Sequence, residues 1–100
     1  MGVNATPIDV ELLKIDIRME RKKSEALGFT MTVNDAPMKD LNSLYKRVRE
    51  LYRLDDELKV TIYPGKEIEY GHVVKVVNEC LRANFTEITF AGAPKEAGGA

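Results

Sequence analysis

The chain has 100 residues, of which 44% are hydrophobic and 31% are charged, so we expect one globular domain with a modest core. Its 15 Lys and Arg residues nearly balance 16 Asp and Glu residues, which gives no reason to expect nucleic acid as a partner. The single cysteine, Cys80, excludes an intramolecular disulfide, and no apolar run approaches the ~20 residues needed to span a bilayer.

The two ends of the chain differ in composition from its centre. Residues 1–11 carry Gly, Asn, Thr and Pro, and they predict a flexible lead-in. Residues 93–100 are rich in Gly and Ala, and they predict a disordered tail. The folded domain is therefore expected over residues 12–92.

The first two predicted elements are strands. From Leu12 to Met19 apolar and polar residues alternate, which is typical of a half-buried strand. A helix is the alternative, because Val10, Leu13 and Ile17 also have helical spacing. After a polar loop, Phe29–Val33 alternates again and is rich in strand-forming residues. The two segments predict a β-hairpin with a long loop.

A basic run, Arg18–Lys23, lies at the start of that loop. Charged residues of this kind commonly form a solvated loop that also protects an exposed strand edge from pairing. The other interpretation is a contact for an acidic partner or for the headgroup surface of a membrane.

An amphipathic helix is predicted to begin near Leu41. The preceding segment Asn34–Pro37 is a turn signal, because Asn and Asp bond their own backbone and Pro fixes φ. Asp40 is well placed as the N-cap. The acids Asp55–Glu57 oppose the helix dipole at a C-terminus, so the helix should end at or before Leu54. The predicted buried stripe consists of Leu41, Leu44, Tyr45, Val48, Leu51 and Tyr52.

A strand–helix–strand unit fills the rest of the domain. Leu58–Tyr63 alternates as a strand, and Pro64-Gly65 predicts a type II turn after it. A helix is expected over about Tyr70–Ala83, with Asn84 as the left-handed residue that follows it. The last strand is expected over Thr86–Ala91. The predicted stripe of the helix consists of Val73, Val76, Val77, Cys80 and Leu81, widened by Val74. The side chains predicted to point inward from the last strand are Ile88 and Phe90.

These elements predict an α+β fold of the order β-β-α-β-α-β. Two helices with apolar stripes need one face of one sheet, so we expect a two-layer sandwich with a mixed four-stranded sheet. The other face should be polar and open to water or to a partner. Its predicted residues are Thr30, Thr32, Lys59, Thr61, Tyr63, Glu87 and Thr89.

The sequence shows no catalytic constellation, and we predict that the protein is not an enzyme and has no cofactor. His72 is the only histidine, so a zinc site would lack ligands, and a solvated histidine in the first helical turn is the favoured interpretation. Cys80 falls in the apolar stripe and is expected to be a buried, inert thiol. Glu67 and Glu69 flank Ile68 on a turn, where carboxylates are usually solvated.

Several segments resemble the periplasmic domain of the ExbD/TolR family of biopolymer transport proteins. The strand and turn KVTIYPGKEIEY, the helix VVKVVNECLRAN and the closing strand EITFAG follow the family pattern, with a tyrosine opening the helix. The upstream hairpin, its turn at Asn34–Pro37 and the first helix also fit. The resemblance covers about residues 14–92. Gly65 stands where the family often has Asp, and Asn84 where it has Gly, and both residues suit a turn.

The resemblance implies a non-catalytic part of a proton-driven complex in the bacterial inner membrane. Such proteins work with an ExbB/TolQ-like membrane protein and a TonB/TolA-like transducer, and their periplasmic domains form homodimers or engage the transducer or peptidoglycan. The parent protein would be anchored by one N-terminal membrane helix that lies outside these residues. A small sheet with an unclosed edge binds partners by adding a strand. We expect that edge at Glu87, Ile88, Thr89, Phe90 and Ala91.

A free-standing soluble α+β binding or regulatory module, with no membrane link, is the alternative. An apolar segment of ~20 residues upstream of residue 3 in the full-length sequence would favour the transport role. The sequence alone distinguishes neither a TonB-like from a Tol-like system nor one strand edge from another.

Overall fold

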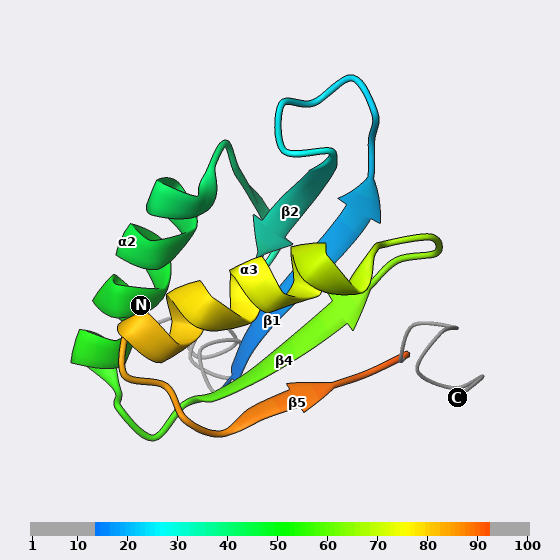
Figure 1. The fold of residues 1–100 in the computed structure, drawn as a ribbon. Coiled ribbons are helices and arrows are strands. Elements are labelled where there is room, and N and C mark those ends of the chain that lie inside the picture. Colours follow the sequence, from blue (N-terminus) through cyan, green and yellow to red (C-terminus); the bar gives the residue numbers. More distant parts are fainter. Residues whose placement is uncertain (1–13, 93–100) are drawn as a thin grey trace, which may run out of the picture.

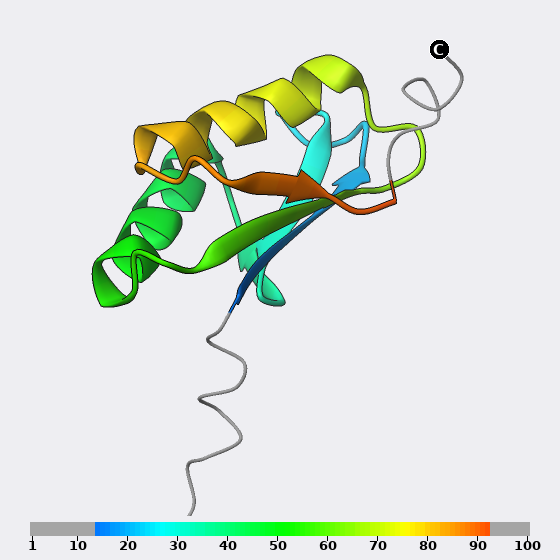
Figure 2. The same ribbon diagram turned by 90° about the horizontal axis from the view of Figure 1, so that it is seen from below.

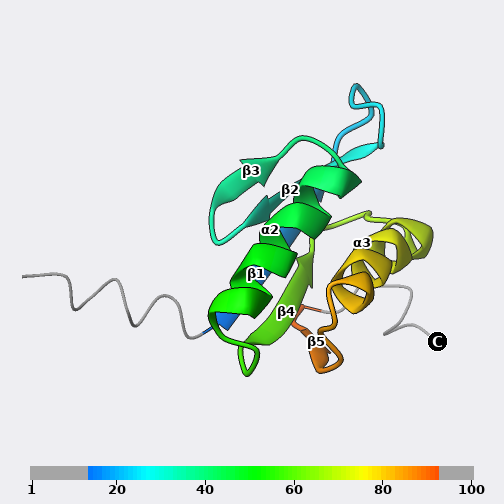
Figure 3. The ribbon, with the colours of Figure 1, turned by 90° about the vertical axis from the view of Figure 1, so that its left-hand side faces the viewer.

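A five-stranded mixed sheet forms one layer of the structure, and two helices cover one of its faces (Figures 1 and 3). This computed structural model describes residues 14–92, so the predicted lead-in and tail lie outside the described residues. The elements are β1 (Lys14–Arg21), β2 (Phe29–Val33), β3 (Ala36–Met38), α2 (Leu41–Leu54), β4 (Lys59–Pro64), α3 (Tyr70–Arg82) and β5 (Ile88–Phe90).

The strands lie in the order β3-β2-β1-β4-β5. β1 pairs with β2 in antiparallel register, with Ile17 opposite Val33, which confirms the predicted hairpin and the strand interpretation of the first element. On its other side β1 pairs in parallel with β4, and β4 pairs in parallel with β5. The α+β class and the mixed sheet with two helices are therefore as predicted.

The prediction of four strands is wrong, because the segment after β2 forms a third strand. Asn34 and Asp35 both have positive φ (48° and 74°), which makes a two-residue hairpin turn of the kind that matches strand twist. The chain reverses there and Ala36–Met38 pairs with Met31–Val33. Pro37 suggested a turn in the sequence, but proline is also tolerated on an edge strand where no N–H is needed.

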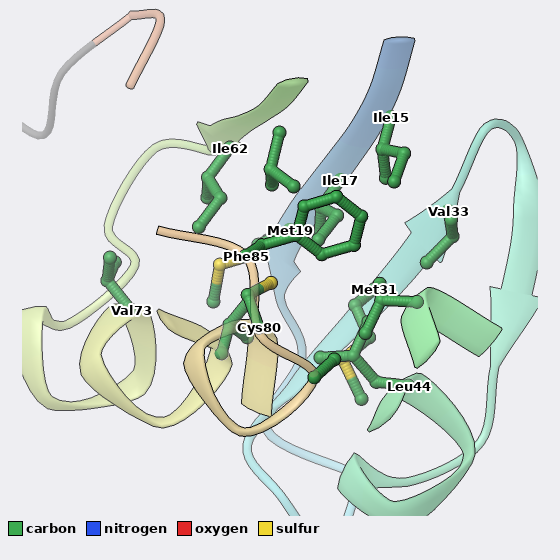
Figure 4. Close-up of a cluster of buried hydrophobic side chains, with 14 of the residues drawn as sticks. Ile15, Ile17, Met19, Met31, Val33, Leu44, Ile62, Val73, Cys80 and Phe85 are labelled. Atoms are coloured by element: carbon green, nitrogen blue, oxygen red, sulfur yellow. The ribbon is translucent and has the colours of Figure 1, made fainter. Parts of the chain in front are cut away.

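The core lies between the helices and one face of the sheet (Figure 4). Ile15, Ile17 and Met19 alternate along β1 with exposed or half-exposed residues, and all three are buried. Side chains from both helices meet them, among them Leu44 of α2 and Cys80 of α3. Each fully buried aliphatic side chain contributes about 1.5–3 kcal/mol relative to an exposed one, so this interlayer contact is the main source of stability.

α2 begins and ends where the sequence predicts. The Ser43 N–H donates to Oδ1 of Asp40 (2.7 Å), so Asp40 is the N-cap, and the helix ends at Leu54 before the three acids. α3 ends one residue earlier than expected, at Arg82, and Asn84 adopts the predicted left-handed conformation (φ 81°).

The turn after β4 is displaced from its predicted position. The Ile68 N–H donates to the Gly65 carbonyl (3.4 Å), and the residue with positive φ is Glu67 (64°). The turn therefore spans residues 65–68 rather than Pro64-Gly65. Ile68, which looked like an isolated apolar residue, is thereby placed in the core, where it is buried.

The cap at Asp40 should make stability depend on pH. The hydrogen bond from Ser43 lowers the pKa of the Asp40 carboxyl below its usual 3.8. Because the folded pKa is the lower one, this contribution is complete above the unfolded pKa and is lost as the pH falls through the folded pKa. We expect Asp40→Ala to lower the melting temperature by about 5 °C at pH 7 and by less at pH 2.

Asp40→Asn is the matched control for this effect, because asparagine caps a helix but does not titrate. In thermal melts followed by circular dichroism, the wild type should lose stability relative to Asp40→Asn only in acid. A constant difference between the two from pH 7 to pH 2 would show that the carboxylate form of the cap contributes nothing.

Candidate partner-binding edge

The segment predicted to bind a partner forms the outermost strand of the sheet (Figure 2). The strand is shorter than predicted, because only Ile88–Phe90 pairs with β4 in the sheet. Glu87 precedes the strand and is exposed, and the N–H of Ala91 still donates to the Ile62 carbonyl (3.0 Å). Among the described residues no strand pairs with the outer side of β5.

The Ala91 hydrogen bond fixes the direction of the backbone groups along β5. In an extended strand the N–H and C=O of one residue point to the same side, and neighbouring residues point to opposite sides. The main-chain groups of Ala91 point to β4, and so do those of Thr89. Ile88 and Phe90 therefore direct their N–H and C=O groups outward. We define the β5 edge as Ile88–Phe90; it presents two residues with main-chain groups available to another strand.

The side chains of the β5 edge leave apolar surface exposed. Ile88 lies opposite Val60 and Phe90 opposite Ile62, so both point to the helix side of the sheet, as predicted. Ile88 is half-buried and packs against the core. Phe90, however, is 46% exposed, because β5 is the outermost of the described strands and none of them covers its ring.

A second apolar stripe on α3 borders this edge. Tyr70, Val74, Val77 and Leu81 follow at i, i+4, i+7 and i+11, so they share one side of the helix, which we define as the α3 flank. Tyr70 is 69% and Leu81 46% exposed, and Val74 is also exposed. The prediction that Val74 and Leu81 belong to the buried stripe is therefore wrong.

The opposite side of α3 shows which way this flank faces. His72 lies half a turn around the helix from Val74, and its ring packs on Phe29 of β2 at 4.9 Å between centroids. β2 lies on the far side of β1 from β4 and β5, so the α3 flank faces the β5 side (Figure 3). The α3 flank and the β5 edge therefore lie on the same side of the domain, and we treat them together as one candidate interface.

The other edge of the sheet is closed to strand addition by its sequence. Val33 and Ala36 flank the two-residue turn and form the hydrogen-bonded pair, so the next residue, Pro37, directs its backbone nitrogen outward. That nitrogen carries no hydrogen, and β3 has only three residues. The two edges therefore differ, and β5 is the one that offers both donors and acceptors.

The uncovered sheet face is polar, as predicted. Its residues are Asp16, Arg18, Glu20, Thr30, Thr32, Thr61, Tyr63 and Thr89, which alternate with the buried positions. The Arg18 guanidinium lies 4.2 Å from the centroid of the Tyr63 ring, so this aromatic surface is occupied by an internal contact.

The remaining chemically interesting residues do not come together. Cys80 is buried, and burial raises the pKa of its thiol to about 12, which makes the reactive thiolate form scarce at neutral pH. His72 lies in the first turn of α3, as predicted, but its ring is packed against Phe29 and is not freely solvated. Glu67 is exposed and pairs with Arg21 (2.9 Å). Within residues 14–92 no three side chains are arranged to hold a metal ion.

The sequence placed the last strand at an open sheet edge, which the strand order bears out, but it did not predict the α3 flank. The signal was present, because the helix carries two overlapping apolar stripes and only one of them can face the sheet. Which stripe is buried depends on where the helix crosses the strands, and this is a property of the tertiary packing.

Residues 4–95 match the family described as Biopolymer transport protein ExbD/TolR, which is nearly the whole chain. No curated protein matches the sequence. None of the helices within residues 14–92 is both long enough and apolar enough to span a membrane.

Proposed function

Since the chain belongs to the ExbD/TolR family of biopolymer transport proteins, we propose that it is a periplasmic coupling domain that joins its partners by strand addition at β5. Members of this family are non-enzymatic accessory proteins of transport, anchored in the inner membrane and associated with ExbB/TolQ-type complexes. In this proposal the domain passes the work of a proton-driven complex to the outer membrane by protein contacts.

The asymmetry of the sheet edges is the observation that carries the proposal. One edge, at β3, presents a proline to the outside, whereas the β5 edge presents main-chain groups that pair with no other strand of residues 14–92, beside exposed apolar side chains. Main-chain hydrogen bonds provide affinity in strand addition, and alternate side chains provide specificity. Natural proteins usually protect such edges, so an open one with an apolar border is suited to an interaction.

Two partners fit this edge by the same chemistry. A second copy would pair β5 with β5, which makes a homodimer with a continuous sheet, and the apolar α3 flank would cover Phe90 of the other subunit. An extended segment of a TonB/TolA-like transducer would add to the same edge. In this proposal any peptidoglycan contacts fall on the polar sheet face and leave the edge free.

A photocrosslinking experiment in the cells that produce the full-length protein tests the proposal. Phe90 is replaced by p-benzoylphenylalanine, an aromatic for an aromatic, and the crosslinked products are identified by mass spectrometry. We expect products with a second copy of the chain or with an extended segment of an energy-transducing protein, because the ring lies beside the open strand edge.

The matched control carries the same photoreactive residue at Ala36, which is exposed on the opposite edge strand. We expect no products of this kind there. Equal products at Ala36 and Phe90, or products at Phe90 only with proteins unrelated to transport, would overturn the proposal.

A further inference from the structure

The outward side of α2 carries a concentration of positive charge that the β5 interface does not use. Five cations and one acid line a shallow depression over this helix. We define the basic face as Lys39, Lys46, Arg47, Arg49 and Arg53. The chain as a whole has a formal charge of −1, so this excess is local and not a reflection of the average composition.

Most of these cations form no ion pair within 4.0 Å in the described part of the chain. The acid, Glu50, is already paired with Arg47 (2.9 Å). Asp40, near the start of the helix, accepts the capping hydrogen bond from Ser43. The other ion pairs found in residues 14–92 lie on β1, between β1 and the turn after β4, and on α3. The cations without a carboxylate within 4.0 Å are Lys39, Lys46, Arg49 and Arg53.

The helix geometry presents these cations together. Lys46, Arg49 and Arg53 follow at i, i+3 and i+7, on the side opposite the buried Leu44 and Val48. A helix of this length is about 21 Å long, so the charges extend over a broad surface. In Figure 3 α2 lies on the outside of the molecule, with the sheet behind it. The basic face is thus directed away from the domain.

An exposed leucine lies at the end of the same helix. Leu54 is 72% exposed and directly follows Arg53. A large apolar side chain next to cations on a surface helix is the arrangement by which peripheral helices contact a bilayer, with the cations at the headgroups and the apolar group in the interface. The depression over α2 is open to solvent, whereas the anchor pockets that give a bound peptide its specificity are enclosed.

We propose that the basic face of α2, together with Leu54, docks on a membrane surface rich in anionic phospholipids. The cations would contact the phosphate groups, for which arginine has the matching geometry. The choice of a membrane as the partner rests on the proposed function, because family members are held close to the inner membrane. Docking would fix the orientation of the domain and leave the β5 edge, on the other side of α3, available.

Vesicle flotation with the 100-residue chain tests this proposal. The probes are phosphatidylcholine vesicles with and without about 40% phosphatidylglycerol, at low salt and near physiological salt. Each cation near an anionic surface contributes about a fivefold gain in binding. We therefore expect binding only to the anionic vesicles, and weaker binding as salt screens the surface charge.

Two double variants, each of which removes two positive charges, distinguish the contribution of the basic face from that of the net charge. Lys46→Gln with Arg53→Gln should weaken vesicle binding about 25-fold, because two contacting charges are lost. Lys66→Gln with Lys75→Gln removes the same amount of charge from exposed sites on the turn after β4 and on α3. This control should weaken vesicle binding no more than about twofold. All four residues are exposed, so both double variants should keep the wild-type circular dichroism spectrum.

Three outcomes would overturn the proposal. They are equal losses in the two double variants, no binding to anionic vesicles at low salt, and capture by soluble polyglutamate in preference to vesicles, which would indicate an acidic polypeptide as the partner. In a chain that also carries Phe90→Pro, neutralising Lys46 and Arg53 should weaken vesicle binding by the same factor as in the wild type. That comparison distinguishes a failure of membrane docking from a failure of strand addition.

Discussion

Replacing Phe90 by proline is expected to abolish the homodimer that we propose to form through β5. The Phe90 N–H points away from β4, so a proline there removes an outward donor without breaking a hydrogen bond within the sheet. Its ring would also occupy the space that a partner carbonyl needs. We expect the dissociation constant of the proposed homodimer to rise at least about 100-fold, because symmetry doubles the loss to two strand hydrogen bonds and their apolar border.

Sedimentation equilibrium over a range of chain concentrations measures this change. Phe90→Ala is the matched control, because it removes the ring but keeps the N–H, and it should weaken the dimer by less. Ile88→Pro provides a second test at the first residue of the strand, where proline is tolerated. If both proline variants keep the wild-type association, or if the wild type is monomeric throughout, β5 is not the dimer edge.

The same hydrogen-bond direction explains why position 89 is a poor site for this test. Thr89 faces β4, so a proline there would break the β4–β5 ladder and lower stability together with association. The sequence alone does not distinguish the two positions, since their directions depend on register. A one-residue slip would exchange them.

Local rules were sufficient for the elements with strong patterns. The α2 helix has a cap, a continuous apolar stripe and an acidic stop, and each signal agrees with the others. In β1 the alternation of Ile15, Ile17 and Met19 outweighed the competing helical spacing, because those three side chains reach one core face only in a strand.

Where the sequence misled, tertiary pairing had overridden a local signal. Pro37 and the Asn-Asp pair suggested a turn that ended the hairpin, yet a left-handed turn of two residues left room for a third strand. Leu81 and Val74 are apolar and have helical spacing, so the sequence predicted that they belong to the core, but both are exposed. Their exposure follows from the position of α3 at the side of the sheet, and the same exposure is what indicates an interface.

Gly65→Ala is expected to destabilise the domain by about 2–3 kcal/mol, which corresponds to a fall of roughly 10–20 °C in melting temperature. A Cβ at Gly65 would lie 2.6 Å from the Met19 carbonyl oxygen, and that atom belongs to the backbone and cannot rotate away. The Gly65 N–H donates to the same oxygen (2.7 Å). Relief of the clash therefore breaks this bond and separates the ends of β1 and β4, the central pair of the sheet. The residue is needed for a close approach rather than for a positive φ.

Gly71→Ala is the matched control, and it should change stability in the opposite direction. Gly71 lies in the first turn of α3, and a Cβ there would meet nothing within 4 Å. Alanine in a helix is favoured over glycine by up to about 1 kcal/mol, so the melting temperature should rise by a few degrees. Thermal melts of the two variants measure both effects. Equal changes at the two glycines would mean that the contact between β4 and the Met19 carbonyl does not limit stability.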